Sequence, residues 1–126
     1  IGKLKEGMSL ADFASHVKKG LDVENVRVVG DLNSEIKKVA ILGGDGNKYI
    51  HAAKFAGADV YVTGDLYFHT AHDAMAIGLN VVDPGHYAEK IMKKGVAQLL
   101  EKAVQEKNWE LEVLVSETNT DPFTFM

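Results

Sequence analysis

The segment from residue 83 to residue 89 carries the side chains best suited to bind a metal ion. It reads Asp-Pro-Gly-His-Tyr-Ala-Glu and follows a short apolar run. Asp83 can cap a helix that starts here, and Pro84 suits the first helical position. His86 and Glu89 would then lie three residues apart on one face and reach one ion, such as zinc, iron or manganese. A protein metal site needs at least three ligands, so these two would form only part of one.

A simpler interpretation of the same segment needs no metal. Glu89 would favour the positive end of a helix dipole, and His86 would be a solvated surface residue. The spacing alone leaves both interpretations open.

A second polar cluster lies between residues 63 and 73, at another predicted junction of strand and helix. His69 stands four residues before Asp73, so one helical face could present an imidazole oriented by a carboxylate, as a general base or metal ligand requires. Asp65 lies at the predicted strand end, where it could also simply cap the helix. We interpret His72 as a surface residue and take His69 as the candidate catalytic side chain.

The third candidate is the glycine-rich turn Gly43–Asn47, whose backbone N–H groups could face an anion such as phosphate. It lacks the third glycine of a dinucleotide-binding loop, because position 49 is tyrosine, and it lacks the Gly-Lys-Ser/Thr of a P-loop. A tight connection between strand and helix is the simpler interpretation. His16 and His51 lie within helical patterns without partners, and we assign them no role.

The elements that must position these residues follow from periodicity. The first helix begins with Ser9 as N-cap and Asp12 in a capping box, and Gly20 is placed to end it. The expected helices cover residues 9–20, 49–56, 68–77 and 85–106, and the expected strands cover residues 26–29, 38–42, 60–62, 79–82 and 111–115. The first two strands are expected to be neighbours or a hairpin.

Strands that alternate with helices predict an α/β fold with a mostly parallel or mixed sheet and helices on both faces. In such sheets the ligand crevice forms at the carboxyl ends of the strands. The loops expected to meet there cover residues 43–47, 63–67, 83–87 and 116–121.

Bulk properties restrict the class of protein. A chain of 126 residues with 46% hydrophobic and 25% charged residues suits one compact domain. The net charge of −4 and the lack of a basic run argue against nucleic acid or an anionic membrane as a partner. The sequence has no cysteine, so any metal must be bound by imidazole or carboxylate. No apolar run is long enough for a membrane span, and we expect a cytoplasmic location.

Several ordered motifs occupy residues 8–10, 26–30, 39–44, 57–65 with His69, 83–89 and 116–123. Together they resemble the motifs of the NIF-three-like family, whose members carry the name GTP cyclohydrolase type two. The resemblance covers essentially the whole chain but only the second half of a long bacterial family member. We therefore expect residues 1–126 to be a single α/β domain, the C-terminal half of a larger protein.

The resemblance implies two similar α/β halves separated by an inserted ferredoxin-like domain, with residues 1–6 leaving the insert. It also implies two divalent metal ions per complete site, held by a histidine pair and an aspartate from the first half and by a His-x-x-Glu pair from the second. That pair falls on His86 and Glu89. This sequence contains no adjacent histidine pair, so its ligand set is incomplete and we expect the fragment alone to be inactive.

In the complete protein, the resemblance implies that metal-bound hydroxide attacks the guanine ring of GTP. His69 would then shuttle protons, Thr63 and Asp65 would line the substrate pocket, and Gly43 and Gly44 would meet phosphate. Two alternatives stay open. One is a non-catalytic metal- or nucleotide-binding regulatory protein, and the other is an assembly module that builds a homo-oligomeric ring, such as a hexamer, in the full-length protein.

Overall fold

The computed structural model describes residues 1–124 and residue 126. The chain divides into two compact units, residues 1–88 and residues 89–126, and each is described by itself. The single domain expected over residues 1–126 includes residue 125, which lies outside the described residues, and it stays a prediction.

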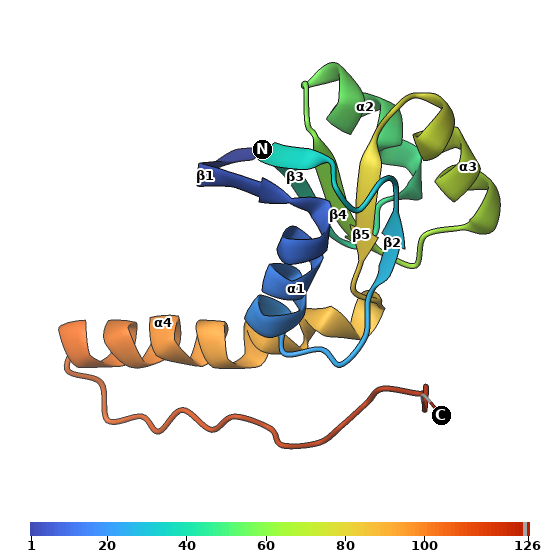
Figure 1. Ribbon diagram of the computed structural model, residues 1–126. Helices are drawn as coiled ribbons and strands as arrows, with labels where there is room; N and C mark the ends of the chain where they lie inside the picture. Colours follow the sequence, from blue (N-terminus) through green and yellow to red (C-terminus); the bar gives the residue numbers. More distant parts are fainter. Residues whose placement is uncertain (125) are drawn as a thin grey trace. The chain divides into compact units, whose positions relative to one another are not determined.

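The first unit is built on a five-stranded sheet with the strand order β1-β3-β4-β5-β2 (Figure 1). The three central strands β3, β4 and β5 are parallel, and the two outer strands are antiparallel to their neighbours. The predicted α/β fold is thus confirmed, with a mixed sheet. The strands are β1 Gly2–Ser9, β2 Arg27–Val29, β3 Glu35–Asp45, β4 Val60–Gly64 and β5 Asn80–Asp83.

Alternation along β4 shows how the sheet separates two cores. Val60 and Val62 pack into one core with helix α1 (Leu10–Leu21), whereas Tyr61 packs into the other with α2 (Ile50–Phe55) and α3 (Phe68–Ala76). Successive strand residues point to opposite faces, so a continuous apolar run is required where both faces are covered. Helices therefore lie on both faces of the sheet, as predicted, and Figure 1 shows α1 on one side and α2 and α3 on the other.

Helix α1 begins as expected and ends later than expected. The Ser9 hydroxyl accepts a hydrogen bond from the Asp12 N–H at 3.1 Å and donates one to the Asp12 carboxylate at 2.7 Å. Gly20 does not end the helix, which continues to Leu21. Asp22 ends it instead in the left-handed conformation at φ 53°, which aspartate adopts more readily than most residues.

The edges of the sheet differ from the prediction. β2 and β3 are not neighbours, because β2 pairs with β5 at the opposite edge from β1. The strand β1 covers residues that the resemblance had placed only as a link from an insert, and its Leu4 and Met8 pack against the α1 core. An exposed edge strand buries one face at most, so its apolar signal is weak.

Strand β3 is longer than predicted and contains the glycine-rich stretch. Its register against β4 shifts between Ile41 and Asp45, where four residues of β3 advance against two of β4. This bulge carries Gly43 and Gly44, with Gly44 at φ 64°. The turn predicted over residues 43–47 is therefore wrong for residues 43–45, which belong to β3. The short 3₁₀ helix η1 (Asn47–Tyr49) and α2 follow the strand.

The helix predicted over residues 85–106 is two elements. Gly85 has φ 77°, a left-handed conformation that cannot start an α-helix, and the 3₁₀ helix η2 (His86–Ile91) follows before α4 (Met92–Glu106). In the described part of the second unit, no strand forms at residues 111–115, so that prediction is wrong. Instead, the Lys93 ammonium donates to the Thr118 carbonyl at 2.7 Å.

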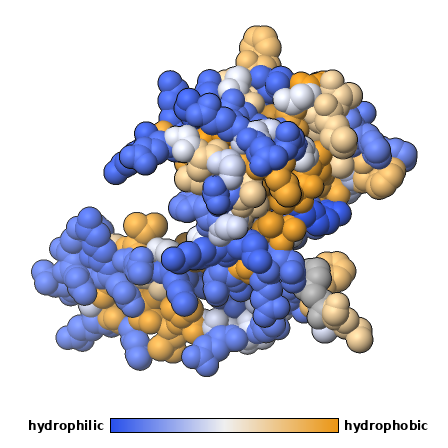
Figure 2. Space-filling view, viewed as in Figure 1, coloured by the Kyte–Doolittle hydropathy of each residue, from blue (hydrophilic) through white to orange (hydrophobic). Residues whose placement is uncertain are grey.

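Apolar side chains reach the surface of the second unit, and Figure 2 shows hydrophobic groups among hydrophilic ones there. Leu99 and Leu100 on α4 are exposed, and so is Trp109 after it. Across residues 1–124 and 126, no helix is long and apolar enough to cross a membrane.

Candidate functional site

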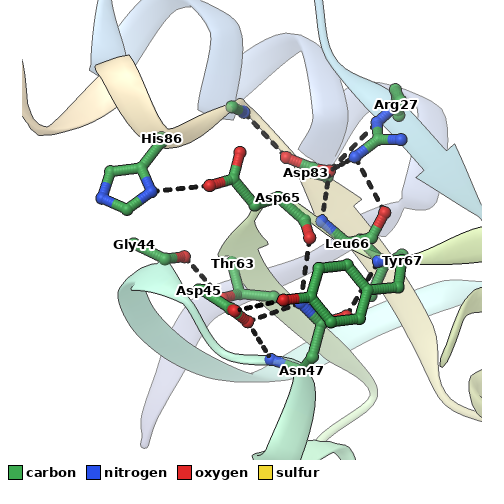
Figure 3. A network of polar contacts seen from close by, with 11 residues as sticks. Arg27, Gly44, Asp45, Asn47, Thr63, Asp65, Leu66, Tyr67, Asp83 and His86 are labelled. Carbon is green, nitrogen blue, oxygen red and sulfur yellow. Dashed lines mark hydrogen bonds and ion pairs between the residues drawn. The ribbon is translucent and has the colours of Figure 1, made fainter.

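Each of the three parallel strands ends at an aspartate. Asp45 is the last residue of β3, Asp65 directly follows β4, and Asp83 is the last residue of β5. Because the carboxyl ends of parallel strands meet at one edge of the sheet, the three carboxylates belong to one polar network (Figure 3). Hydrogen bonds join three of the four loops that were predicted to meet, those over residues 43–47, 63–67 and 83–87. The fourth, residues 116–121, follows no strand and belongs to the second unit.

Asp83 is the buried centre of this network, with a side chain only 1% exposed. Its Oδ1 accepts from the Gly85 N–H at 2.8 Å, and its Oδ2 accepts from the Leu66 N–H at 3.0 Å. The Arg27 guanidinium donates to Oδ2 from Nε at 3.0 Å and also from Nη2, forming an ion pair. The prediction that Asp83 caps a helix is therefore wrong. Asp83 instead joins β2 to the loops after β4 and β5.

Asn47 ties the loop after β3 to the loop after β4. Its Nδ2 donates to the Asp65 carbonyl at 2.9 Å, and its Oδ1 accepts from the Tyr67 N–H at 2.8 Å. The residue is 8% exposed, and both of its amide groups are thus used by backbone partners. This clamp fixes the path of the chain through residue 65.

Asp45 lies beside this clamp and receives three donors. Hydrogen bonds from the Asn47 side chain, the Asn47 N–H and the Tyr67 hydroxyl stabilise its charged form and lower the pKa of its carboxyl below the usual value. The Tyr67 hydroxyl donates to Asp45 Oδ2 at 2.9 Å, and this bond to a carboxylate raises the pKa of the phenol. Asp45 is therefore an ionised acceptor within the network.

A pair of partly exposed side chains, Asp65 and His86, also belongs to the network. Asp65 Oδ2 lies 2.7 Å from His86 Nδ1, and the side chains are 45% and 54% exposed. In Figure 3 the other ring nitrogen of His86 points away from Asp65. Asp65 has φ 53°, a left-handed conformation that costs a non-glycine residue about 1–3 kcal/mol, and such strain is common at functional sites.

Gly64 permits the close approach of the loops that carry this pair. A Cβ atom at residue 64 would lie 2.9 Å from the Gly85 carbonyl carbon and 3.0 Å from the His86 nitrogen, which are backbone atoms. Only glycine fits there without moving the segment that starts at Gly85. The loop after β5 therefore packs directly on the end of β4.

The donors here suit a metal ion in kind. Imidazole and carboxylate bind zinc, iron or manganese, and a metal-ligating histidine usually has its other ring nitrogen hydrogen-bonded, as His86 has. Glu89 is the first residue of the second unit, so its association with His86 rests on their spacing in the sequence. Within residues 1–124 and 126, no group of three or more His, Asp or Glu side chains is arranged to hold a metal ion.

Comparison with known proteins then decides the family. The family model described as Duf34/NIF3 (NGG1p interacting factor 3) matches residues 1–122. The chain belongs to this family. A Bacillus subtilis relative named "GTP cyclohydrolase 1 type 2 homolog" is 64% identical over the whole chain, which covers 34% of that relative.

Solved structures agree with the family in fold. A Bacillus cereus protein related to NIF3 is 58% identical, with a TM-score of 0.93 over 99% of this chain and 35% of its own. A Staphylococcus aureus protein is 41% identical, with a TM-score of 0.94 over 98% of this chain and 40% of its own. The chain thus spans about a third of the length of the Duf34/NIF3 relatives it matches.

The other predicted site residues occupy different surroundings. The Thr63 side chain is buried and donates to the Gly44 carbonyl at 3.1 Å, so it supports the bulge that carries Gly43 and Gly44. His69 is exposed on α3 and packs edge-on against Phe68, with 5.5 Å between ring centroids. Within the described chain, no hydrogen bond joins His69 to Asp73. The roles predicted for His69, Thr63, Gly43 and Gly44 stay predictions.

Sequence reasoning missed four side chains of the network: Arg27, Asp45, Asn47 and Tyr67. Arg27 had a signal, because it is the only arginine in the sequence and stands beside a β-branched run. Its register opposite Asp83 depends on the pairing of β2 with β5, which the sequence pattern placed elsewhere.

Proposed function

We propose that this chain supplies His86 and Glu89 as ligands to a divalent metal site that further polypeptide completes. The observation that carries the proposal is the His86 imidazole, 54% exposed at the carboxyl edge of the sheet, with one ring nitrogen facing Asp65 and the other facing away. Glu89 follows three residues later, a spacing that suits a shared ion.

The remaining donors would come from the part of the family members that this chain does not span. The chain covers 34% of the Bacillus subtilis relative, so most of that protein lies outside the matched region. We propose a site with two ions, such as zinc, iron or manganese, in which this chain holds one side.

For the complete protein, we propose metal-dependent hydrolysis of a nucleotide ring, with GTP as the substrate. Support comes from the relatives' name, "GTP cyclohydrolase 1 type 2 homolog". A bound metal would supply an activated water at neutral pH. In this chain His86 and Glu89 would bind and orient the metal ion. His69 would hold or move a proton, and the backbone of Gly43 and Gly44 would contact phosphate. The cytoplasmic location stays a prediction.

The test compares two single histidine substitutions in a full-length family member that contains this chain. His86→Ala should reduce zinc affinity by more than about 100-fold, because losing a residue that only hydrogen-bonds a metal ligand already costs about 10–100-fold. Nucleotide turnover should fall together with zinc affinity. His51→Ala, which removes an exposed histidine of α2, should change neither. Metal content by mass spectrometry and competition with a chelating dye measure the effect.

Retention of stoichiometric metal by His86→Ala would contradict the proposal. The same variant distinguishes the alternatives. If the protein is a non-catalytic regulator, His86→Ala would lose metal, and the wild type would show no nucleotide turnover. An assembly module that forms a homo-oligomeric ring would keep both its assembly and its partners.

A further inference from the structure

We infer that Asp65 is a positioning residue that holds His86 with its proton on Nδ1, so that Nε2 presents its lone pair for a cation. The cation rests on the proposed function, but the position of the proton does not. This role differs from the substrate contact that the sequence predicted for Asp65.

The proton position follows from the chemistry of the pair. An ionised carboxylate only accepts hydrogen bonds, so the 2.7 Å contact between Asp65 Oδ2 and His86 Nδ1 requires a proton on that nitrogen. In a neutral imidazole the other nitrogen, Nε2, then carries the lone pair. Figure 3 shows this nitrogen on the side of the ring that points away from Asp65.

Backbone contacts on both sides hold the pair in place. The Asn47 side chain donates to the carbonyl of Asp65 at 2.9 Å, and the Asp65 backbone has the left-handed conformation at φ 53°. On the other side, Asp83 Oδ1 fixes the Gly85 N–H at 2.8 Å, and the Gly85–His86 backbone packs on Gly64. A chance surface contact between two mobile side chains would not have its two backbones fixed in this way.

Such a carboxylate does two things for a ligand histidine. It selects the tautomer and the ring orientation, and it raises the basicity of the nitrogen that binds the metal. Loss of such partners commonly lowers metal affinity about 10–100-fold. Asp65 would act through His86 without touching the ion.

The deciding experiment is ¹⁵N NMR of the histidine rings in the metal-free protein at about pH 9, above the ordinary histidine pKa of about 6.5. The signals of His86 are assigned by their loss in His86→Gln. We expect the Nδ1–H tautomer in the wild type. Asp65→Asn keeps the side-chain shape and tolerates the left-handed backbone, but it should shift the proton to Nε2, because the amide can donate to Nδ1.

Two further variants control the result. Asp65→Gly removes the carboxylate while suiting φ 53°, so the Nδ1–H preference should disappear without backbone strain. Glu24→Gln removes the same charge from an exposed residue after α1 and should leave the His86 spectrum unchanged. An Nε2–H tautomer in the wild type, or an unchanged tautomer in both Asp65 variants, would overturn the inference.

Zinc titration of the full-length family member separates this inference from the proposed function. Asp65→Asn should weaken zinc binding about 10–100-fold, and Glu24→Gln should not. If the wild type binds no zinc but the tautomer responds to Asp65 as described, the proposed metal site fails and the positioning of His86 by Asp65 stands. If zinc binds and Asp65→Asn leaves its affinity unchanged, the metal site stands and the role of Asp65 is refuted.

Discussion

Asp83→Ala should be among the most destabilising substitutions in the first unit. The side chain touches no proposed metal ligand, so the effect comes from its buried hydrogen bonds. The carboxylate is 1% exposed and accepts hydrogen bonds from Leu66, Gly85 and Arg27. Removing the carboxylate leaves these donors without their acceptor, and the Leu66 N–H is buried.

The magnitude follows from the exposure of each donor. The Leu66 N–H is buried, and an unsatisfied buried donor costs about 1–3 kcal/mol. The Gly85 N–H is only partly buried, so its loss should cost about 0.5–1.5 kcal/mol. The Arg27 side chain is 67% exposed and can be solvated, which limits its share to about 0–1 kcal/mol. We expect a total loss of about 1.5–5.5 kcal/mol in the free energy of unfolding.

Urea unfolding followed by far-UV circular dichroism at pH 7 measures this loss. Asp73→Ala, which removes an exposed aspartate from α3, should stay within about 0.5 kcal/mol of the wild type. Arg27→Ala should cost less than Asp83→Ala, because the carboxylate keeps its two backbone donors. A loss below about 1 kcal/mol for Asp83→Ala would refute this account of the network.

Two further predictions concern the same edge of the sheet. Gly64→Ala should destabilise the protein by about 1–3 kcal/mol in the same urea assay, because its Cβ would meet the Gly85 backbone at 2.9 Å; a neutral effect would show that the two loops separate freely. The lowered pKa of Asp45, caused first by the Asn47 side chain, stabilises the fold above the unfolded value of about 3.9, and this contribution is lost as the pH falls through the lower folded value. The urea midpoint of Asp45→Asn should therefore fall less between pH 6 and pH 2 than that of the wild type, and parallel curves would contradict the prediction.

The middle of the fold could be predicted because its signals are local. The strands β4 and β5 are short, mostly apolar and buried on both faces, and the helix α3 between them ends just before Gly78. The left-handed Gly85 could not be foreseen, because a Pro-Gly pair before a periodic segment also suits the start of a helix. Periodicity therefore predicted one helix where the structure has two elements.

The partners of the network depend on which strands are neighbours, and that is not a local property. Asp65 and His86 are 21 residues apart, and only the adjacency of β4 and β5 brings their loops together. The parallel direction of these strands was predicted, and with it the convergence of their loops at one edge, but the strand order was not. The pairing of β2 with β5 was not, because a three-residue strand carries no mark of its partner, and with it the ion pair between Arg27 and Asp83 was missed.

The position of β2 also bears on how this protein avoids aggregation. β5 contains Val81 and Val82, both fully buried, and β2 is the short strand that covers its outer side. If β2 detached, the apolar strand β5 would become an edge strand with unpaired backbone N–H and C=O groups. Strands of other molecules can add to such an edge. The salt bridge between Arg27, the first residue of β2, and Asp83 would then hold β2 in place and prevent self-association. A variant without this salt bridge should form oligomers before it unfolds.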